Sequence, residues 1–539
     1  MTGGHFTKRD LKRIRDHGLT LEDVERQLGL FMMPSPYQTL NRPCTPGDGI
    51  MVLAPEEADA LAAFYEAEKA ALHAIKFVPA SGAATRMFRS LLRYGGQAQN
   101  PTPTLVLEEA RAGRKEAQDL ITFMEGLESF AFFPELRRVL SARGLTRARR
   151  TGQYPWAGVI RSLLDESGLG YALLPKGLLM FHGYPEGGRT AFEEHLVEAV
   201  SYAADGDRRC ALHVTVSEEH RSKFEALLDR VAPIYGERYG VSYEVDFSVQ
   251  KRATATLAVD LENRPFRNEN QELLFRPGGH GALIENLNDL DADLVFIKNI
   301  DNVAPDRLKP NTLKWKKTLG GCLLRIQKKL FKWMNVLSSH GSDPLVVDGA
   351  MAFARDTLSL SVPDSVAGAS PEQRGTFLMA RLNRPLRVCG MVRQAGEPGG
   401  GPFWVKDSAG IPTPQIVETA QIDPESREQQ AILAASTHFN PVDIVCGIKD
   451  WQGRAFDLKA YVDPEAVFIS RKSKDGKDLK ALEHPGLWNG AMAHWISVFV
   501  DVPATTFNPV KTVNDLLRDT HQPAGAENVE ASRTPGRDG

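Results

Sequence analysis

The stretch IKFVPASGAATRMFRSLL, residues 75–92, is the part of the chain from which the fold is best inferred. Its apolar start predicts a strand, and the small residues at 81–84 predict a turn. Met87, Leu91 and Leu92 then share one face of a predicted helix. We therefore expect one strand–loop–helix unit here.

Predicted strands and helices alternate along the rest of the chain. A helix is expected to start at about Thr190, because Thr190 and Glu193 have the spacing of a capping box. Strands are predicted at CALHVTVS, VSYEVDFSVQ and DLVFIKNID, residues 210–217, 241–250 and 293–301. This alternation predicts an α/β fold with a mainly parallel, mixed sheet flanked by helices.

Three parts are predicted along the sequence. A helical N-terminal extension covers residues 1–70, a main domain covers 71–518 with a helical insertion at about 308–380, and a disordered tail of low apolar content covers 519–539. Residues 308–338 mix leucines with many lysines, as membrane-surface and nucleic-acid-binding helices also do. We interpret them as a core-packed helix with a solvated basic face, because nothing else in the chain supports those partners.

Composition narrows the class of protein. The chain has 539 residues, 42% of them apolar and 25% charged, and a formal net charge of -3, which is typical of an ordinary globular protein. This balance favours no nucleic-acid partner, and no apolar run predicts a membrane partner, a signal peptide or an anchor. The five cysteines have no zinc-site spacing, so we expect reduced thiols and a cytoplasmic location. The oligomeric state is not predicted.

The small-residue turn is the first candidate binding element. Small side chains let a backbone approach a triphosphate, while helix N-terminal amides and Arg86 supply positive potential. The turn is neither a P-loop nor a dinucleotide-binding motif, and packing alone explains such turns equally well. The candidate nucleotide-binding residues are Ser81, Gly82, Ala83 and Thr85.

Two lysines are candidate phosphate ligands. Lys176 follows a proline in the apolar stretch LLPKGLLMF, residues 173–181, where an ammonium needs an anion unless its side chain extends to the surface. Lys511 follows a proline in TFNPVKTVNDLL, residues 506–517, and precedes a predicted helix. It can reach into a site or merely cap an element.

A glycine-rich turn is the third candidate. In FRPGGHGALIENL, residues 275–287, a bare backbone can hydrogen-bond the edge of a nucleobase, with a histidine pointing at the ligand or packing under it. Taken alone, the motif can equally be simple loop chemistry. The candidate residues are Pro277, Gly278, Gly279, His280 and Gly281.

Polar side chains follow the predicted strand in DADLVFIKNIDNVAPD, residues 291–306. Asn299, Asp301 and Asn302 stand at its carboxyl end, where parallel sheets place their ligands. Mg2+ takes one or two protein carboxylates and completes its shell with phosphate and water, so Asp301 is the first-choice metal ligand. A role in capping the turn is the alternative, more for Asn302 than for Asp301.

In their order along the chain, these motifs resemble the nucleotide-sugar pyrophosphorylases, particularly the UDP-glucose and UDP-N-acetylhexosamine family. ASGAATRM resembles the family's Gly-rich loop, PKGLLMF its lysine motif, PGGHG its uracil-facing turn, NIDN its metal-bearing segment, and FNPVKTVNDLL its phosphate-contacting lysine motif. PQIVETAQI at 414–422 and STHFNPVDIV at 436–445 are also similar to family segments. The resemblance spans residues 76–517.

Departures from the family pattern indicate a divergent bacterial branch. Ala83 and Ala84 replace expected glycines, and Met180 and Phe181 replace the usual Pro-Val. These changes affect how a triphosphate would be seated. The acceptor need not be glucose 1-phosphate.

The resemblance implies a Rossmann-like nucleotide-diphospho-sugar transferase fold and a nucleotidyl transfer that needs Mg2+. An acceptor phosphate oxygen attacks the α-phosphorus of an NTP, UTP by similarity of the turn, and pyrophosphate leaves. Arg86 would hold the β- and γ-phosphates, Lys176 the transferring group and Lys511 the phosphate of the acceptor, a sugar 1-phosphate or similar molecule. Gln250 and the Pro277–Gly281 turn would contact the base.

Two other classes stay open. A glycosyltransferase that uses an NDP-sugar normally has a DxD-like metal motif, and Asp291 and Asp293 have that spacing, although a turn before a strand explains them too. A non-catalytic nucleotide-binding protein is the second, because a fold does not fix a function.

Overall fold

The computed structural model describes residues 6–33, 37–96, 101–148, 152, 154–394, 396, 399–407 and 410–523. At its centre is a nine-stranded sheet in which β15 alone runs antiparallel to its neighbours. The mainly parallel sheet predicted from the sequence is confirmed. In spatial order the strands are β2 (Thr45–Pro46), β3 (Gly49–Met51), β18 (Ile496–Asp501), β12 (Leu386–Arg393), β15 (His438–Gly447), β11 (Leu294–Lys298), β4 (Ala74–Pro79), β7 (Arg209–Val216) and β8 (Ser242–Val249).

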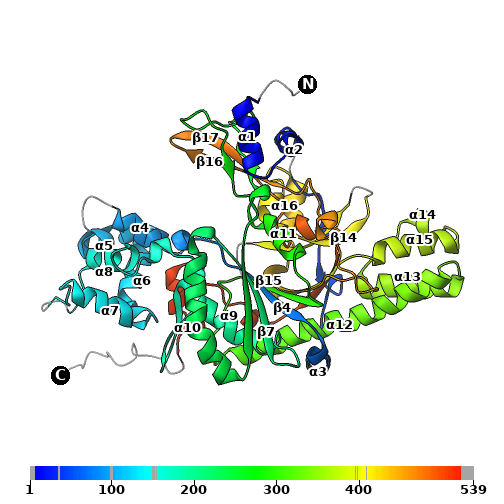
Figure 1. Cartoon of the computed structure of the whole chain (residues 1–539), viewed down its shortest axis with the longest axis horizontal. Helices are drawn as coiled ribbons and strands as arrows, with labels where there is room; N and C mark the ends of the chain where they lie inside the picture. The colour runs from blue at the N-terminus through cyan, green and yellow to red at the C-terminus, as the bar shows by residue number, and fades with distance from the viewer. Residues whose placement is uncertain are drawn as a thin grey trace, which may run out of the picture.

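The sheet separates two hydrophobic cores, which explains why its central strands are apolar on both faces. In β11 every residue is buried, and alternate side chains enter opposite cores: Leu294 and Phe296 one, Val295 and Ile297 the other. The first core is closed by α3 (Pro55–Glu68), α9 (Ala191–Ala199), α10 (Arg221–Tyr239) and α12 (Lys309–His340), and the second by α11 (Ile284–Asn288) and the segments around it (Figure 1).

Two helical bodies extend from opposite ends of the sheet (Figure 1). One consists of α4 (Arg89–Gly95), α5 (Pro103–Arg111), α6 (Lys115–Glu125), α7 (Phe133–Ala142) and α8 (Trp156–Leu164). The other is an arm formed by the far part of α12 with α13 (Pro344–Leu358), α14 (Asp364–Ala367) and α15 (Pro371–Leu382).

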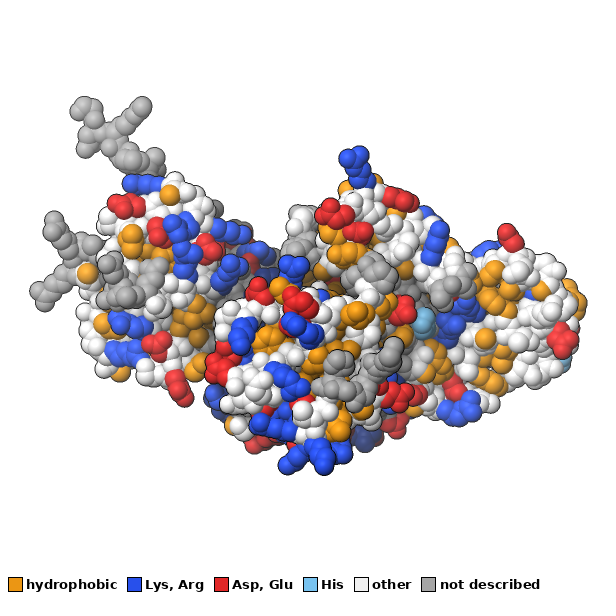
Figure 2. All heavy atoms as spheres, turned by 90° about the horizontal axis from the view of Figure 1, so that it is seen from above, with side chains coloured by type: hydrophobic (Ala, Val, Ile, Leu, Met, Phe, Trp, Pro, Cys, Tyr) orange, Lys and Arg blue, Asp and Glu red, His pale blue; other side chains and the backbone are white. Residues whose placement is uncertain are grey.

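The long basic helix α12 packs into the protein. Leu319, Leu323, Leu330 and Leu337 are all buried, and the helix contacts α3, β12 and β15. The core-packed interpretation is therefore confirmed. On the face seen in Figure 2, basic and acidic side chains are interspersed over all three bodies. Among the described residues, no helix is long and apolar enough to cross a membrane.

The helical extension is shorter than the predicted residues 1–70. Only α1 (Lys8–Asp16) and α2 (Leu21–Phe31) form it, and each begins with a threonine capping box. The next segments join the main body: β1 (Leu40–Pro43) pairs with β13 (Gly400–Lys406), β2 and β3 extend the central sheet, and α3 packs on α12. The predicted boundary thus divides a packed unit, because β1 and β3 pair with strands more than 350 residues away.

The C-terminal boundary also shifts. Residues 519–521 form a short 3-10 helix in which His521 is buried and bonded to His182, so they are part of the fold and not of a tail. The rest of the predicted tail, residues 524–539, lies outside the described part of the chain.

Candidate active site

The loop after β4 carries the first set of predicted residues. Ser81, Gly82, Ala83, Thr85 and Arg86 are exposed there, just before and within a short 3-10 helix over Ala84–Arg86. A Cβ added to Gly82 would meet no atom within 4 Å, so the loop backbone is open to a ligand at that point.

This loop is joined to the segment that carries Lys176. Ala83 forms an isolated bridge with Pro175, and the Ala84 amide donates to the Leu174 carbonyl over 3.2 Å. Two motifs that are about 90 residues apart in the sequence therefore lie side by side. The intervening residues form the helical body of α4–α8, whose helices pack chiefly on one another.

Lys176 meets Asp301 at the carboxyl end of β11. Its Nζ donates to Asp301 Oδ2 over 2.7 Å and to the Val510 carbonyl over 2.7 Å. Lys511 Nζ lies 3.7 Å from the same Asp301 oxygen. The side chains of Lys176 and Asp301 are 15% and 11% exposed, whereas that of Lys511 is 57% exposed, so one nearly buried ion pair has a second cation at its solvent side.

Backbone pairing holds the Lys511 segment against both loops. The Val510 amide donates to the Asp301 carbonyl over 3.0 Å, and the Val513 amide donates to the Met87 carbonyl over 3.1 Å. Asp515 accepts from the Lys511 and Thr512 amides, which fixes the turn. The segments that carry Lys176, Asp301 and Lys511 therefore lie together, and they meet the first loop at Met87, next to Arg86. The helix predicted after Lys511 is a five-residue 3-10 helix, Val513–Leu517.

A cavity of 690 Å³ opens at the carboxyl ends of β4, β7 and β8. Its volume lies within the range of about 300–1,000 Å³ that is usual for small-molecule sites. Three predicted residues line it: Ser81, Gln250 and Pro277. The Gln250 Nε2 donates to Thr254 Oγ1 over 3.1 Å, which leaves its carbonyl oxygen as the acceptor for a ligand. Ser81 belongs to the first loop, and Ala83 of that loop is bridged to Pro175 beside Lys176, so this loop connects the cavity to the ion cluster.

The rest of the predicted glycine-rich turn is used for packing. A Cβ on Gly281 would collide with the Pro485 carbonyl, and one on Gly278 would collide with Thr254 and His484. His280 stacks on Trp488 at 4.4 Å and its Nδ1 accepts from the Leu487 amide. Packing against residues 484–488 thus accounts for Gly278 and Gly281, and contact of Gly278, Gly279, His280 or Gly281 with a base stays a prediction.

Several lining residues were not predicted. Asp16 and His17 of the N-terminal extension line the 690 Å³ cavity together with Arg252 and Arg276. Glu418 lies 3.8 Å from His280, and burial raises the pKa of its carboxyl. No local pattern marks these residues, since their contacts are with segments far away in the sequence.

Asp301 is a single carboxylate with two lysine ammonium groups beside it. Among the described residues, no group of three or more His, Cys, Asp or Glu side chains could hold a metal by itself. Because an ammonium group is not a metal ligand, an ion at Asp301 would take the rest of its ligands from substrate phosphates and water, and Mg2+ binding at Asp301 stays a prediction.

The DxD-like pair lies at the opposite edge of the sheet. Asp291 and Asp293 precede β11 and both pair with Lys449, and Asp293 also accepts from the His73 amide. These contacts support the interpretation of a turn before a strand.

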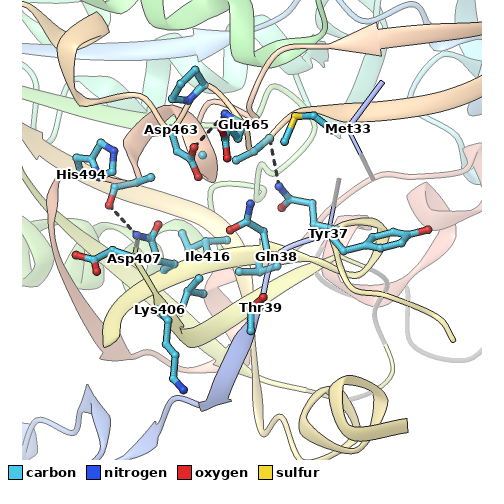
Figure 3. Close-up of a pocket in the computed structure, with 18 residues that line it drawn as sticks. Met33, Tyr37, Gln38, Thr39, Lys406, Asp407, Ile416, Asp463, Glu465 and His494 are labelled. Atoms are coloured by element: carbon cyan, nitrogen blue, oxygen red, sulfur yellow. Dashed lines mark hydrogen bonds between the residues drawn. The ribbon is translucent and has the colours of Figure 1, made fainter. Parts of the chain in front are cut away.

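A second cavity, of 460 Å³, lies beside β14 (Pro412–Glu418) (Figure 3). None of the predicted site residues lines it, but four residues of the family-like segment 414–422 do: Gln415, Ile416, Val417 and Gln421. Lys406, Asp407, Asp463, Glu465 and His494 are among the side chains around it. Gln421, Ala466 and Gly490 line it. The Gln421 side chain accepts from Asn489 and donates to the Ala466 carbonyl, so this lining adjoins the His280–Glu418 region. The cavity is therefore a neighbour of the candidate site and not part of it.

The chain is similar to a known family and to solved structures. A family model described as "Domain of unknown function (DUF4301)" matches residues 7–522. No curated protein matches the sequence significantly. The chain is similar to a solved UDP-N-acetylglucosamine pyrophosphorylase from Trypanosoma brucei, with an inhibitor, at 12% identity and a TM-score of 0.47, covering 96% of this chain and 80% of that one. It is also similar to a UDP-glucose pyrophosphorylase from Leishmania major in complex with UDP-glucose, at 12% identity and a TM-score of 0.41, again covering 96% and 80%. Both belong to the class of enzyme that the sequence motifs resemble.

Proposed function

The chain belongs to the DUF4301 family, and we propose that it is a nucleotidyltransferase that transfers UMP from UTP to a sugar 1-phosphate or a similar phosphorylated acceptor. The observation that carries this proposal is the meeting of Lys176 and Lys511 at Asp301, beside the exposed loop after β4. A carboxylate for a metal and separate cations for several phosphates are what such a transfer needs. A Rossmann-like nucleotide-diphospho-sugar transferase fold is part of the same proposal.

The reaction requires no protein nucleophile. An oxygen of the acceptor phosphate attacks the α-phosphorus of UTP, the new P–O bond forms, and the bond to the β-phosphate oxygen breaks, so that pyrophosphate leaves with the electron pair. Catalysis then depends on positioning and on neutralising charge. When bound at Asp301, Mg2+ would neutralise charge that develops on the transferring phosphoryl group.

The residues of the chain divide this work. Arg86 and the amides of the first loop hold the β- and γ-phosphates, because they are exposed at the start of a helical turn. Lys176 neutralises the transferring group by giving up part of its contact with Asp301. Lys511, which is more exposed, holds the phosphate of the acceptor. Gln250 presents its carbonyl oxygen to a donor on the base.

The contact between Lys176 and Asp301 has a further consequence. Their hydrogen bond keeps both side chains in place before substrate arrives, which reduces the ordering needed on binding. Since the same Asp301 oxygen faces both lysines, a metal at Asp301 would displace the ammonium groups toward the phosphates. The proposal therefore makes metal and nucleotide binding mutually dependent.

The test is Mg2+-dependent release of pyrophosphate. The purified chain is given each of the four common NTPs with a panel of sugar 1-phosphates and non-sugar monophosphates. We expect release with UTP and one acceptor class, and a loss of orders of magnitude in Lys176→Met and Asp301→Asn with the fold intact. The matched control is Lys472→Met, an exposed lysine remote from the described contacts of the site.

Other results would support the other classes. Transfer from an NDP-sugar without pyrophosphate chemistry supports a glycosyltransferase. That reading has little structural support, because its candidate pair, Asp291 and Asp293, is bonded to Lys449 at the far edge of the sheet. Nucleotide binding without turnover across the whole panel supports a non-catalytic binding protein.

A further inference from the structure

The N-terminal extension forms one wall of the nucleotide-sized cavity. The cavity is lined by residues after β4, β7 and β8, by Phe275, Arg276 and Pro277, and on the remaining side by Asp16 and His17 at the end of α1. Without the extension this side would be open. The end of α1, which looks like part of an accessory in the sequence, thus closes this side of the cavity.

His17 and Phe275 form an aromatic pair on this wall. Their ring centroids are 4.4 Å apart with an angle of 31° between the planes. Both side chains are only half-buried, and they are the aromatic rings among the described residues that line the cavity. A half-exposed aromatic pair inside a polar-rimmed cavity is suited to stacking with a flat ring system.

The extension is fixed in place by bonds to the same segments. Arg13 Nε donates to the Leu273 carbonyl over 2.8 Å, and Gln27 accepts from the Leu257 amide over 2.8 Å. Asp10 is 2% exposed and pairs with Arg267, whose hydrogen bonds hold the pKa of Asp10 at about 2. These contacts flank the Phe275 strand on both sides, so His17 is held at the cavity before any ligand binds.

The position of His17 itself is also restrained. It is the C-cap residue of α1, and its Nδ1 pairs with the Arg13 carbonyl over 2.9 Å. The next residue, Gly18, has a φ of +75° and packs on Ala253. The ring therefore has one face against Phe275 and little freedom to turn away.

The ligand that fits this cavity has a flat base and an anionic tail. The charged lining of the cavity includes the carboxylates of Asp16 and Glu218, but Arg252 and Arg276 also line it and form no ion pair in the described part of the chain, so both arginines are available to an anionic group. At its inner side Ser81 begins the loop whose third residue, Ala83, is bridged to Pro175 beside Lys176. Because Ser81, His17 and Phe275 line the same cavity, one ligand in it can touch both the aromatic pair and the start of the first loop.

We infer that the nucleobase of the substrate stacks on the His17–Phe275 pair, and that the C-terminal end of α1 is therefore part of the nucleotide-binding site. The inference rests on the proposed function for the identity of the ligand as a nucleotide. It does not depend on which acceptor is used or on turnover.

The experiment measures binding and not catalysis. The full chain is titrated by calorimetry with the four NTPs, and with inorganic tripolyphosphate as a probe that has phosphates but no base. We compare the wild type with His17→Ala, with His17→Phe, which keeps a flat ring, and with Arg15→Ala, an exposed residue of the same helix that does not line the cavity. Thermal unfolding of each variant shows whether the fold is retained.

In His17→Ala we expect the Kd for the preferred NTP to rise about 5- to 150-fold, the range found when an aromatic ring that stacks on a base is replaced by alanine. The Kd for tripolyphosphate should not change. His17→Phe, which keeps a flat ring, should retain NTP binding, and Arg15→Ala should bind NTP as the wild type does. Phe275→Leu should weaken NTP binding without adding to the effect of His17→Ala, because Phe275 supports the His17 ring from one side and holds it in place for the base.

Three results would overturn the inference: an unchanged NTP affinity in His17→Ala, an equal loss of tripolyphosphate binding, or a wild type that binds none of the NTPs. The first leaves the proposed function standing if pyrophosphate release is found. Conversely, a base-dependent effect of His17 in a protein that turns over no acceptor would support the stacking surface and contradict the transferase.

Discussion

The Lys176–Asp301 pair can be tested by measuring separately how much it contributes to the stability of the fold and how much it contributes to turnover. We consider Lys176→Met, Asp301→Asn and the double variant. Each single change leaves the partner in a nearly buried place without its counter-charge, since the two side chains are 15% and 11% exposed. Lys511, at 3.7 Å from Asp301, compensates only part of the loss.

The size of the stability effect follows from the contact. A hydrogen bond between charged groups contributes about 1.5–3 kcal/mol, and the low exposure of this one limits solvent screening. Each single variant should therefore lose about 2 kcal/mol in the free energy of unfolding. In the double variant neither charge is left alone, so the loss should be smaller than the sum of the two by about 1–3 kcal/mol, the coupling typical of residues in contact.

The effect on turnover should behave differently. If the two charges act on metal and phosphate, each single variant loses about two to three orders of magnitude in kcat, as enzymes do when one group that stabilises developing charge is removed. The double variant regains stability but not turnover. Chemical denaturation gives the first quantity and pyrophosphate release the second. A double variant that recovers both would refute the reasoning, because the pair would then serve only itself.

Three further predictions concern two glycines and a histidine. Gly82→Ala should leave the melting temperature unchanged, because the added Cβ meets no atom within 4 Å, but should weaken NTP binding if phosphates approach this backbone; unchanged binding argues against that approach. Gly281→Ala should instead destabilise the fold by about 1–3 kcal/mol or more, since its Cβ collides with the Pro485 carbonyl, and a wild-type melting curve would contradict the packing role. His521 is 2% exposed, and burial together with His182 lowers its pKa from 6.5 to about 3. As the pH falls below 6.5, His521 therefore takes up a proton in the unfolded chain before it does so in the folded protein. The free energy of unfolding should fall by about 1.4 kcal/mol for each pH unit until the pH reaches the folded pKa. His521→Asn should flatten the pH dependence of the free energy of unfolding by that slope below pH 6.5. Glu194, with a pKa of about 2 against 4.5, adds its own loss of stability around pH 4.5 and below, in both proteins. An equal slope in both proteins would show that the histidine is protonated in the fold.

Much of the central sheet was predictable because its signals are local. The run Leu294–Ile297 is apolar and bounded by polar residues, and the capping box at Thr190 and Glu193 marks the start of α9, which begins at Ala191. Polar residues directly after a predicted parallel strand lie at the ligand-binding edge by the geometry of the sheet. That rule placed Asp301 and the first loop at the same edge without any knowledge of the pairing.

The parts that were not predictable depend on contacts between distant segments. The glycine-rich turn at 277–281 has a composition that fits either a ligand or a neighbouring chain, and only the structure shows Pro485 against Gly281. The short strands at 40–51 have too few residues for a periodic pattern, and their partners lie near the other end of the chain. His17 follows a helix as any C-cap residue does, and its contact with Phe275 joins positions 258 residues apart.

Buried charged groups beneath the candidate site were also not predictable from the sequence, and they bear on how Asp301 is held. Lys76 and Lys298 both pair with Glu198 at 0–1% exposure, at 3.2 and 2.8 Å, and burial lowers the pKa of Lys76 to about 7. An isolated lysine within an apolar strand gives no hint of such a partner. Next to them His195, also fully buried, is bonded through Nε2 to the Ile300 carbonyl over 3.2 Å, directly before Asp301.

This arrangement means that the loop with Asp301 is held from below by groups that a ligand cannot reach. Buried ion pairs of this kind add little net stability, because the cost of desolvating the charges offsets their attraction. Their effect is instead geometric: with its carbonyl bonded at Ile300 and its strand fixed through Lys298, Asp301 can vary its partner above the sheet without moving its backbone. An exchange of Lys176 for a metal at Asp301, as the proposed function requires, needs a carboxylate that stays in place while its partners change.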